Sequence, residues 1–371
     1  MNFCINKAVI VNSLKKIQGV TEKSSITPIT SNVLIEAKKN TVTTSATNFE
    51  VGVIVSAEAK VKKEGRVVVE ARKTYEIIKE MPEGEISIIG KDSGWVEISS
   101  GRKIVFNVTG LSAEEFPKVE MDSKVKFSEI NAKNIYELIK NTIYATSDDK
   151  TRETLRGILV ERQEKGLRMV ATDGHRLALA DRAFSGEEDK AIQRSVIIPQ
   201  KGAREIKRLI EGLDKEKKIR VGLGEKGVVI KAKEEMIVVR LIDGEFPNYK
   251  KVIPLNNKNR VEMRTRALEE SLRRIALVTE EDTKVAKFEV KAGGLTILSK
   301  KVGLGDAREE MGVDYLGEDV EIGLNIRYIL DVLGVIESEE VVLEMMDGKT
   351  PVLVKGKGKD HTIAVIMPMV L

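Results

Sequence analysis

Two stretches of the chain end in the same Phe-Pro pair and divide the rest of the sequence: KIVFNVTGLSAEEFP (103–117) and MIVVRLIDGEFP (236–247). Each runs from a strand-like segment toward a proline, which cannot extend the hydrogen-bond ladder of a strand and therefore suits the exit from a domain. The two pairs lie 130 positions apart, and a third strand of this kind, HTIAVIMPMVL (361–371), closes the chain. This spacing predicts three repeats that fill the sequence.

Helical periodicity recurs with a similar spacing between these exits. Amphipathic stretches of a first kind, each followed by a polar, acidic loop, are 7–19, 132–145 and 267–278. Stretches of a second kind, each beginning with a β-branched or apolar run that leads into a helix, are 67–81, 196–210 and 320–334. Alternating patterns between them are typical of half-buried strands, about eight in each repeat.

The pattern predicts an α+β fold of three repeated domains, 1–125, 126–252 and 253–371, each with two helices packed on antiparallel sheets. A chain of 371 residues is too long for one ordinary core, which agrees with several domains. Apolar residues make up 42% of the sequence, enough for such cores, whereas aromatic residues reach only 4%. The low aromatic content disfavours a protein that reads single-stranded nucleic acid by base stacking.

Residues that usually carry catalysis or bind metals are scarce. Cys4 is the only cysteine, and His175 and His361 are the only histidines, so neither an intramolecular disulfide nor a Cys/His zinc site can form. No apolar run approaches the roughly 20 residues of a membrane span, and we find no signal-peptide pattern. We therefore expect a reduced, cytoplasmic protein with no membrane partner, no cofactor, no metal and no catalytic residues.

Basic residues recur on the predicted helices, although the net charge is only +4. On the helices of the first kind, the position two residues after an aligned leucine is Lys16, Lys140 or Arg274. Two residues correspond to about 200° around a helix, so a leucine that faces the core places this cation on the opposite face.

The helices of the second kind also carry cations at matched positions. The first matched set is Arg72, Lys201 and Asn325, and the second is Lys79, Arg208 and Val332. Within one helix, the spacing of Lys201, Arg204 and Arg208 predicts a stripe. An ordinary solvated face would explain any single cation, but recurrence favours a shared lining that contacts phosphates without reading bases.

Three patterns resemble enzyme sites without supplying the context that such sites need. Residues 222–227 match G-x-G-x-x-G, but the strand-like VVIKAK follows where a dinucleotide site requires a helix, so we expect a hairpin loop. The acidic groups at 148–149 and 280–282 fall in loops that we expect to be solvated. His175 and Cys4 could pair as base and nucleophile, but no surrounding motif supports them, and we expect a structural histidine with its hydrogen bonds satisfied.

The repeat is broken at two places. Residues 46–50 read ATNFE where 171–176 read ATDGHR, which suggests an insertion of 174–176 in the second copy. Such a segment at a strand end is consistent either with a different turn or with a recognition loop. The chain also ends in an apolar segment, 365–371, which we expect to be packed or to line a methionine-rich groove.

The sequence resembles the bacterial DNA sliding clamp family, the β subunits of the replicative DNA polymerase. The motifs that carry the resemblance are ATDGHRLA (171–178), DGEFPNYKKVIP (243–254), EIGLNIRYILDVL (321–333) and VIMPM (365–369), and the similarity spans the whole chain. The resemblance implies a non-enzymatic processivity factor, a head-to-tail homodimer that closes into a ring around double-stranded DNA. Two identical heterologous contacts close on a two-fold axis, so assembly stops at the dimer.

The resemblance also implies partners that bind through short peptide motifs: the catalytic subunit of the replicative polymerase, the clamp loader, other polymerases and repair proteins. Their peptides would insert apolar anchors into a pocket between the second and third domains. By similarity, that pocket is lined by Leu155, Thr172, Gly174, His175, Arg176, Leu177, Pro247, Val252, Asn325, Tyr328, Val365, Met367, Pro368 and Met369.

The same similarity extends to DNA and to the dimer contact. With Arg152 added from the resemblance, the cations expected to face DNA are Lys16, Arg72, Lys79, Lys140, Arg152, Lys201, Arg204, Arg208 and Arg274. The strand at 103–108 is expected to pair with the third domain of a second copy, which would protect a free sheet edge. The apolar residues expected to meet there are Phe106 and Val108 with Leu277 and Val278.

Two positions depart from the family pattern. Val370 stands where members often carry arginine, which would weaken a polar contact to a bound peptide. Lys23 and Ser24 stand where a relative carries arginine, so the DNA contact is not carried over to them. Two other functions remain open at this level: a dinucleotide-dependent enzyme that uses residues 222–227, and a peptide-binding adaptor that never meets DNA.

Overall fold

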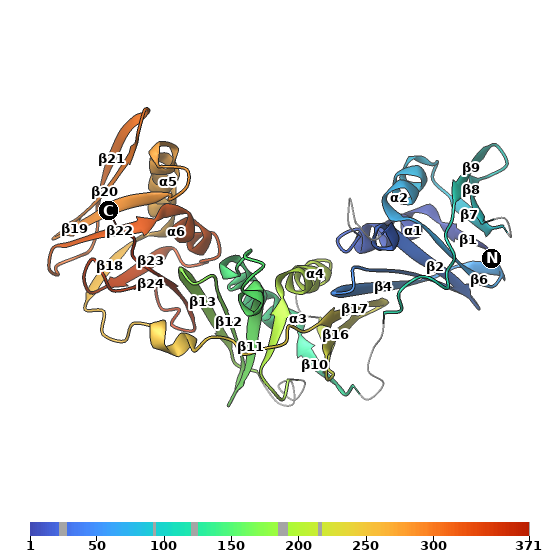
Figure 1. Cartoon of the computed structure of the whole chain (residues 1–371), viewed down its shortest axis with the longest axis horizontal. Coiled ribbons are helices and arrows are strands. Elements are labelled where there is room, and N and C mark those ends of the chain that lie inside the picture. Colours follow the sequence, from blue (N-terminus) through green and yellow to red (C-terminus); the bar gives the residue numbers. More distant parts are fainter. Residues whose placement is uncertain (22–27, 92–93, 120–124, 185–191, 214–216, 371) are drawn as a thin grey trace. The chain divides into compact units, whose positions relative to one another are not determined.

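The computed structural model describes residues 1–21, 28–91, 94–119, 125–184, 192–213 and 217–370. Its element order repeats three times along the chain (Figure 1). In each repeat a strand leads into a helix, a group of strands follows, and a second helix precedes three closing strands. The α+β class and the pair of α-helices in each repeat are confirmed.

The elements of the first repeat are β1 (Asn2–Asn6), α1 (Lys7–Ile17), β2 (Asn32–Lys38), β3 (Thr41–Thr47), β4 (Val51–Glu58), β5 (Lys60–Lys63), β6 (Gly65–Glu70), α2 (Ala71–Glu80), β7 (Glu85–Gly90), β8 (Trp95–Ser100) and β9 (Ile104–Thr109). Those of the second are β10 (Phe127–Asn131), α3 (Ala132–Lys140), β11 (Gly157–Gln163), β12 (Gly166–Thr172), β13 (Arg176–Arg182), β14 (Val196–Pro199), α4 (Gln200–Glu211), β15 (Lys218–Leu223), β16 (Gly227–Ala232) and β17 (Glu235–Arg240).

The third repeat contains β18 (Asn259–Arg264), α5 (Thr265–Ile275), β19 (Val285–Lys291), β20 (Gly294–Lys301), β21 (Gly305–Gly312), β22 (Val320–Asn325), α6 (Ile326–Leu333), β23 (Glu340–Met345), β24 (Val352–Gly356) and β25 (Thr362–Ile366). Short 3₁₀ turns that matter below are Ile143–Ala145, Tyr249–Val252 and Ala276–Val278. None of the described helices has the length and the apolar run that crossing a bilayer requires.

The helices of the first kind bury the leucines on which the repeat was aligned. Leu14, Leu138 and Leu272 are fully buried, as the periodicity predicted. The second of these helices is shorter than expected, because α3 ends at Lys140 and the Thr142 hydroxyl donates a hydrogen bond of 2.8 Å to the Leu138 carbonyl. A side chain that bonds to the backbone in this way competes with continued helix.

Two eight-stranded sheets each join the strands of two repeats. Their orders are β10-β15-β16-β17-β4-β3-β2-β6 and β14-β11-β12-β13-β25-β24-β23-β18. The joining pairs are antiparallel, and their registers match: Gly52 pairs with Val238 across β4–β17, and Leu177 pairs with Val365 across β13–β25. The last strand of one repeat therefore completes the sheet of the repeat before it.

Two smaller sheets leave strand edges unpaired in the described part of the chain. Their orders are β5-β1-β7-β8-β9 and β21-β20-β19-β22. Strand β9 closes the first repeat as β17 and β25 close the others, and β21 occupies the place that β4 and β13 hold in theirs. Two closing strands, β17 and β25, are thus paired with β4 and β13. The third closing strand, β9, and the strand equivalent to β4 and β13, which is β21, each keep one edge without a partner in the described part of the chain.

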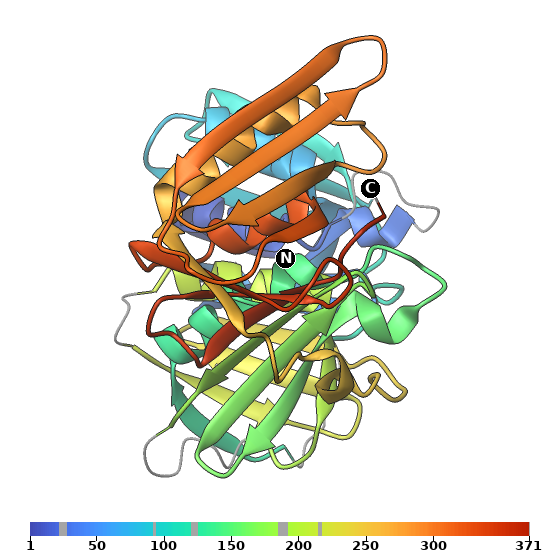
Figure 2. The same cartoon turned by 90° about the vertical axis from the view of Figure 1, so that its left-hand side faces the viewer.

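The chain divides into two compact units, and each contains one of the joining sheets. The first is built mainly from Met1–Lys133 and Lys201–Leu241, and the second mainly from Asn134–Gly186 and Ile242–Leu371. In the second unit, α5 packs against α6 and contacts β20 and β21 (Figure 2). Its main core gathers buried residues of these helices and of both sheets of the unit, including Leu272, Phe288 and Ile329.

Candidate functional sites

The turn between β12 and β13 is fixed by side chains at its start. The Thr172 hydroxyl accepts a hydrogen bond from the Gly174 N–H (3.1 Å). The Asp173 carboxylate accepts those of His175 (2.9 Å) and Arg176 (3.0 Å). Such Asx-type bonds satisfy three backbone donors locally, so the turn holds one shape without a partner.

The turn between β3 and β4 has the same bonds and the same length. The Asn48 side-chain oxygen accepts the N–H groups of Glu50 (3.2 Å) and Val51 (2.8 Å). Three residues separate the strands in both repeats, and the flanking registers agree. The expected insertion at 174–176 is therefore wrong: the segment is substituted, not lengthened, because both turns span the same strand geometry.

The expected pocket residues all fall in the second compact unit, which contains β13 and β25 (Figure 1). Leu177 pairs with Val365 across the two strands, and the Met367 N–H donates to the His175 carbonyl (2.9 Å). Met367 is 37% exposed and Val252 is 41% exposed, whereas Leu177 and Val365 are buried. The structure therefore places one exposed apolar side chain, that of Met367, next to a buried apolar pair.

A small apolar core lies beneath this surface. Leu177, Val365 and Tyr249 belong to it, with Phe246 packed against it from the position before Pro247. The Tyr249 hydroxyl donates to Glu161 (2.6 Å), and burial raises the pKa of that hydroxyl above its usual value. At this exit the aromatic residue of the Phe-Pro pair therefore anchors the segment that leaves the sheet.

Arg176 was expected in the pocket wall, but its side chain is turned into the protein. Only 10% of it is exposed. It forms ion pairs with Asp173 (3.0 Å) and Asp331 (2.5 Å), donates to the Tyr144 carbonyl (2.6 Å), and stands 4.5 Å from the centroid of the Tyr328 ring. Burial, the largest influence, raises the pKa of Tyr144 despite the nearby guanidinium. Arg176 is thus a buried link between the second and third repeats.

Asn325 also has a structural role that the sequence did not reveal. Its side-chain oxygen accepts the N–H groups of Arg327 (2.9 Å) and Tyr328 (3.3 Å), so it caps the start of α6. Its amide donates to the Thr283 carbonyl (2.9 Å), and the residue is buried. The expected alignment of the second helices was therefore off by two positions, and Arg327, which is exposed, matches Arg72 and Lys201.

Of the remaining pocket residues, Leu155 is buried and Pro247 is exposed. Pro368 and Met369 are half-buried, and the Met369 N–H donates to the Gly323 carbonyl (2.9 Å). Val370 is 97% exposed. The end of the chain is therefore attached to the third repeat by its backbone, while Leu371 lies outside the described residues.

Several cations expected to face DNA are engaged by carboxylates of the same chain. Lys140 lies 2.8 Å from Glu337, and Arg152 lies 3.0 Å from Asp149. Further ion pairs join Lys16 to Glu235, Arg72 to Glu76, Arg208 to Glu205 and Arg274 to Glu309. Pairs that are exposed contribute only about 0–1 kcal/mol, so a phosphate can compete for such cations.

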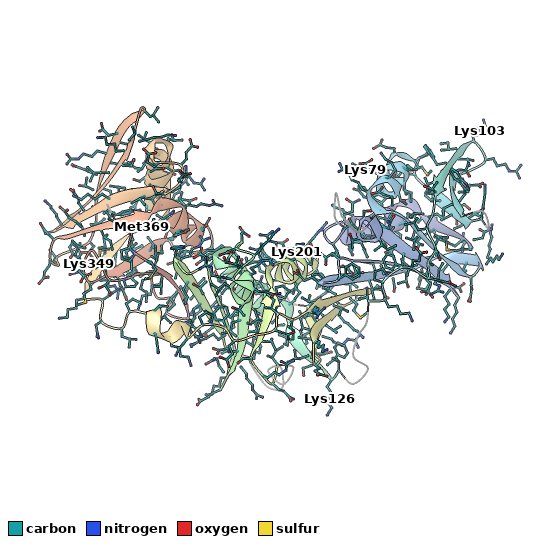
Figure 3. All side chains as sticks on the ribbon, in the orientation of Figure 1. Lys79, Lys103, Lys126, Lys201, Lys349 and Met369 are labelled. Atoms are coloured by element: carbon teal, nitrogen blue, oxygen red, sulfur yellow. The ribbon has the colours of Figure 1, made fainter. Side chains whose placement is uncertain are left out.

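The cationic stripe on α4 agrees with the periodicity. Lys201, Arg204 and Arg208 are exposed, while Ala203 and Ile206 on the opposite side are buried. Lys79 lies exposed near the end of α2, as Lys201 does at the start of α4 (Figure 3). Lys23 and Ser24 lie outside the described residues.

The residues expected at the dimer contact lie beside the two unpaired strand edges. Phe106 on β9 is 43% exposed, and Val105 before it is 47% exposed. In the third repeat, Leu277 is 75% exposed in the 3₁₀ turn that contacts β21, and Val278 is half-buried. Val108 is half-buried. Exposed apolar side chains along an open sheet edge are typical of an interaction surface.

The patterns that resembled enzyme sites do not form such sites in the described part of the chain. Residues 222–227 form the β15–β16 hairpin, closed by a hydrogen bond from the Gly224 N–H to the Gly227 carbonyl (2.8 Å). No three His, Cys, Asp or Glu side chains gather as a metal site among the described residues. The His175 side chain is exposed without a hydrogen bond to any described residue, so the expected satisfied histidine is wrong, and only its backbone is used.

Comparison with known proteins assigns the whole chain. The N-terminal, central and C-terminal domains of the DNA polymerase III beta subunit match residues 1–120, 129–248 and 250–370. The chain belongs to the beta sliding clamp family. The beta sliding clamp of Pseudomonas putida is 32% identical over 370 residues, covering 100% of both chains. Crystal structures of the DNA polymerase III subunit beta of Pseudomonas aeruginosa and of the sliding clamp of Caulobacter crescentus superpose with TM-scores of 0.93 and 0.92, each at 30% identity and 100% coverage of both chains.

Membership of the family settles the general function. The chain has the three-domain DNA-clamp fold, which closes into a ring by dimerisation. It is a non-catalytic processivity factor of DNA replication, whose partners are double-stranded DNA and the replicative polymerase. The dinucleotide-dependent enzyme is thereby excluded.

Proposed function

We propose that peptide segments of the replicative polymerase, the clamp loader, other polymerases and repair proteins dock beside the β12–β13 turn. Support comes from two exposed side chains. Met367 follows Val365 of the buried pair Leu177–Val365, and Val252 ends the turn whose Tyr249 shares a core with that pair. Full burial of one apolar side chain of a peptide against such a surface contributes about 1.5–3 kcal/mol. The half-buried Pro368 and Met369, with Pro247 and Tyr328, complete the surface that we assign to the peptide.

Other residues of the expected set hold this surface in shape. Arg176, Asn325 and Leu155 are largely buried, and the first two are held by several hydrogen bonds. Pre-organisation of this kind lowers the entropy that a bound peptide must lose on the protein side. Thr172, Gly174 and His175 present the turn itself, whose backbone orients the end of β25.

We infer that duplex DNA meets the cations of the helices. The exposed stripe of α4 and the exposed residues Arg72, Lys79 and Arg274 support this, since evenly repeated cations attract phosphates without reading bases. Many of these cations already have carboxylate partners, which weakens any one phosphate contact. Weak, salt-dependent contacts suit a ring that must slide while it retains DNA by enclosure.

The repeated sheet topology supports a proposed dimer contact. Strands β17 and β25 each pair with the third strand after the first helix of the preceding repeat, at β4 and β13. Strand β9 is the remaining closing strand, and β21 is the third strand after the first helix of the third repeat. We infer that β9 of one copy pairs with β21 of the other, head to tail, which would bring Phe106 and Val108 near Leu277 and Val278 of the partner subunit. The same pairing at the second edge closes the ring.

The boundaries 1–125, 126–252 and 253–371 are the division that best fits this scheme. They follow the repeated element order, although the compact units cut through the middle repeat because the joining sheets do. We place the protein in the cytoplasm, where bacterial replication takes place.

One observation carries the proposal of a closed ring. The two junctions β17–β4 and β25–β13 have the same topology, and the strands β9 and β21 that could form a third junction each have an unpaired edge in the described part of the chain. Its test is retention on DNA of different topology. A ring loaded by a clamp loader should remain on a closed circular plasmid and leave within minutes after the plasmid is linearised. Equal retention on both would refute enclosure, and failure to be retained on either would favour an adaptor that never meets DNA.

A further inference from the structure

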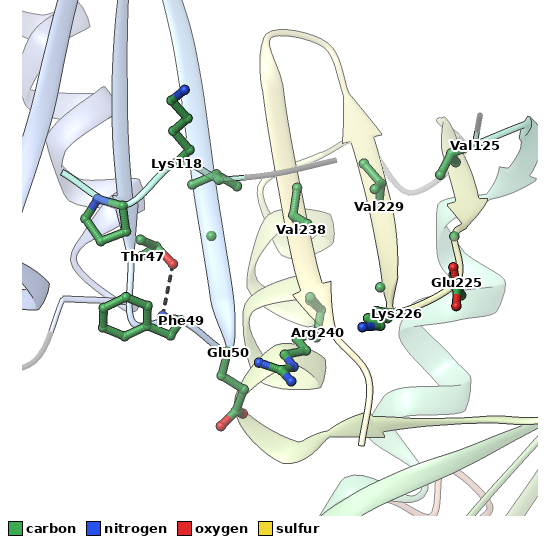
Figure 4. Close-up of a pocket in the computed structure, with 16 residues that line it drawn as sticks. Thr47, Phe49, Glu50, Lys118, Val125, Glu225, Lys226, Val229, Val238 and Arg240 are labelled. Carbon is green, nitrogen blue, oxygen red and sulfur yellow. Dashed lines mark hydrogen bonds between the residues drawn. The ribbon is translucent and has the colours of Figure 1, made fainter. Parts of the chain in front are cut away.

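The junction between the first and second repeats carries a pocket of its own (Figure 4). It has a volume of about 640 Å³, which falls in the range typical of ligand sites. Its lining comes from the β3–β4 turn, the segment after Phe116, and the β15–β16 and β16–β17 hairpins. We propose that this pocket is a second docking groove, which accepts an extended partner segment with an apolar side chain next to carboxylates.

The groove occupies the place in the first junction that the proposed peptide surface has in the second. Gly52 pairs with Val238 where Leu177 pairs with Val365. The Arg240 N–H donates to the Glu50 carbonyl (2.8 Å), just as the Met367 N–H donates to that of His175 (2.9 Å). The internal repeat therefore builds the same frame twice. The inference rests on the proposed function only where it compares the groove with the peptide surface of the second junction. The pocket itself is observed independently of that proposal.

The side chains on the shared frame differ, and the difference is chemical. Arg240 stands where the second junction has Met367, so a cation replaces an exposed thioether. Position 52 is glycine, and Val119 fills the space there: a Cβ atom at that position would overlap a methyl group of Val119. The floor remains apolar, with Val229 and Val238 facing the groove (Figure 4).

Phe49 shows that the rim is more than ordinary surface. Its side chain is 57% exposed at the mouth of the groove, and its backbone has a φ of 69°. Left-handed backbone is unfavourable for a bulky aromatic residue, and glycine occupies the equivalent position 174 with a φ of 94°. An exposed aromatic side chain held in a strained conformation indicates a binding role, since packing does not require it there.

The charges select the occupant. Lys118, Lys226 and Arg240 line the groove and are exposed, and none of them forms an ion pair with a described residue. A carboxylate beside the apolar anchor would supply that missing partner. Glu50 and Glu225 also line the groove, so its three cations exceed its two carboxylates by only one charge. Such a balance accepts one or two carboxylates of a peptide but opposes the longer run of phosphates of single-stranded nucleic acid.

The test uses full-length dimeric protein and a fluorescein-labelled peptide, Asp-Leu-Val-Leu-Asp. Binding is followed by anisotropy in a Met367→Ala/Pro368→Ala background, which removes the anchors of the other surface. We expect saturable binding of one peptide per protomer, about tenfold weaker after Arg240→Glu and about fivefold weaker for Asn-Leu-Val-Leu-Asn. Phe49→Gly should weaken binding similarly without lowering the thermal midpoint, because it relieves the backbone strain.

Several results would overturn the inference. These are absence of saturable binding up to about 1 mM peptide, affinity unchanged by both Arg240→Glu and Phe49→Gly, or tighter Arg240-dependent binding of a labelled oligothymidylate, which would assign the groove to nucleic acid. A polymerase-tail peptide titrated in parallel separates the two proposals. We expect it to bind wild type and the Arg240→Glu variant equally. Its failure to bind wild type would refute the peptide surface of the second junction and leave the groove standing.

Discussion

Arg176 donates a hydrogen bond of 2.5 Å to Asp331, and the two residues lie 155 positions apart in the sequence. The bond joins the start of β13 to α6, and therefore the second repeat to the third. The same guanidinium faces the Tyr328 ring and donates to the Tyr144 carbonyl. The junction thus depends on one largely buried charge whose hydrogen bonds are met by both repeats.

We predict that Arg176→Ala opens this junction. Removing one partner of a buried ion pair leaves the other charge unpaired and typically costs about 3–5 kcal/mol. Because the chain has several domains, the loss is best measured locally, by hydrogen exchange at the Met367 amide and along β25. Exchange there should rise at least tenfold, and Asp331→Asn should have a smaller effect because the contact with Tyr328 remains.

Arg327→Ala provides the matched control. Arg327 is an exposed arginine on the same helix, and its loss should leave exchange at β25 unchanged. If Arg176→Ala also left this exchange unchanged, Arg176 would not hold the two repeats together, and its role would be limited to lining the peptide surface.

Peptide binding should depend on the apolar end of the chain. Met367→Ala with Pro368→Ala should weaken binding of a polymerase-tail peptide by about tenfold or more, because anchors in the middle of such a surface dominate the affinity. Calorimetric titration measures the effect, and sedimentation should show an intact dimer. Leu316→Ala is the control, as Leu316 is 91% exposed in the segment between β21 and β22 and is not part of the assigned surface. Identical titration curves for the double variant and wild type would disprove the assigned surface.

The sequence predicted features that depend on local pattern. The alternation of apolar residues placed Leu14, Leu138 and Leu272 in the core, and the strand after 222–227 excluded a dinucleotide site. The apolar pattern could not predict local hydrogen bonds between side chains and the backbone. Glu70 and Asn325 cap α2 and α6, and the caps, unlike the apolar pattern, show which positions of these helices correspond.

Features that depend on contacts between residues far apart in the chain could not be predicted from the sequence. Nothing in β4 or β17 indicates that the two strands pair, because a strand edge of alternating residues fits many partners. The burial of Arg176 was missed for the same reason, since its partners Tyr144 and Asp331 come from elements far along the chain. The expected pocket position came from family resemblance, which specifies a place on the surface but not the direction of each side chain.

Charge on the free edge should prevent ring closure. Phe106→Glu would place a carboxylate in the middle of the proposed β9–β21 contact, and loss of a central aromatic anchor typically weakens an interface roughly 30-fold. Analytical ultracentrifugation at micromolar concentration should therefore detect monomers. Leu255→Glu adds the same charge at a residue that is 89% exposed outside these edges, and it should remain dimeric. A dimer that survives Phe106→Glu would rule out this pairing.

Reversal of the α4 stripe should impair retention on DNA. Lys201→Glu, Arg204→Glu and Arg208→Glu together replace three exposed cations of one helix face, so phosphate attraction should become repulsion. Retention on circular plasmid after loading should fall severalfold at low salt and less at high salt. The control replaces Lys165, Lys233 and Lys349, exposed lysines of hairpin turns, with glutamate. An equal loss of retention in both variants would show that the net charge of the protein, and not the position of the α4 stripe, causes the effect.

Stability of the first unit should respond to pH through Glu205. Its carboxylate lies against Gly19, where a Cβ atom would overlap it, and the Arg208 guanidinium lies 3.7 Å away. Burial, only partly opposed by Arg208, raises the pKa of Glu205 above its ordinary value of 4.5. The folded protein therefore binds this proton more tightly than the unfolded chain, so the stabilising contribution is fully present at low pH and is lost as pH rises through the raised pKa.

Glu205→Gln should remove that dependence. At pH 7 the variant should melt at a higher temperature than wild type, because no charge is buried, and the difference should shrink as pH falls toward 4.5 and below. Thermal melts between pH 4 and 8 measure the difference. Glu211→Gln, at the exposed end of the same helix, should give a small and pH-independent difference. If the Glu205→Gln difference were equally flat across the range, solvation of Glu205 would be the same in both states and burial would not be the cause.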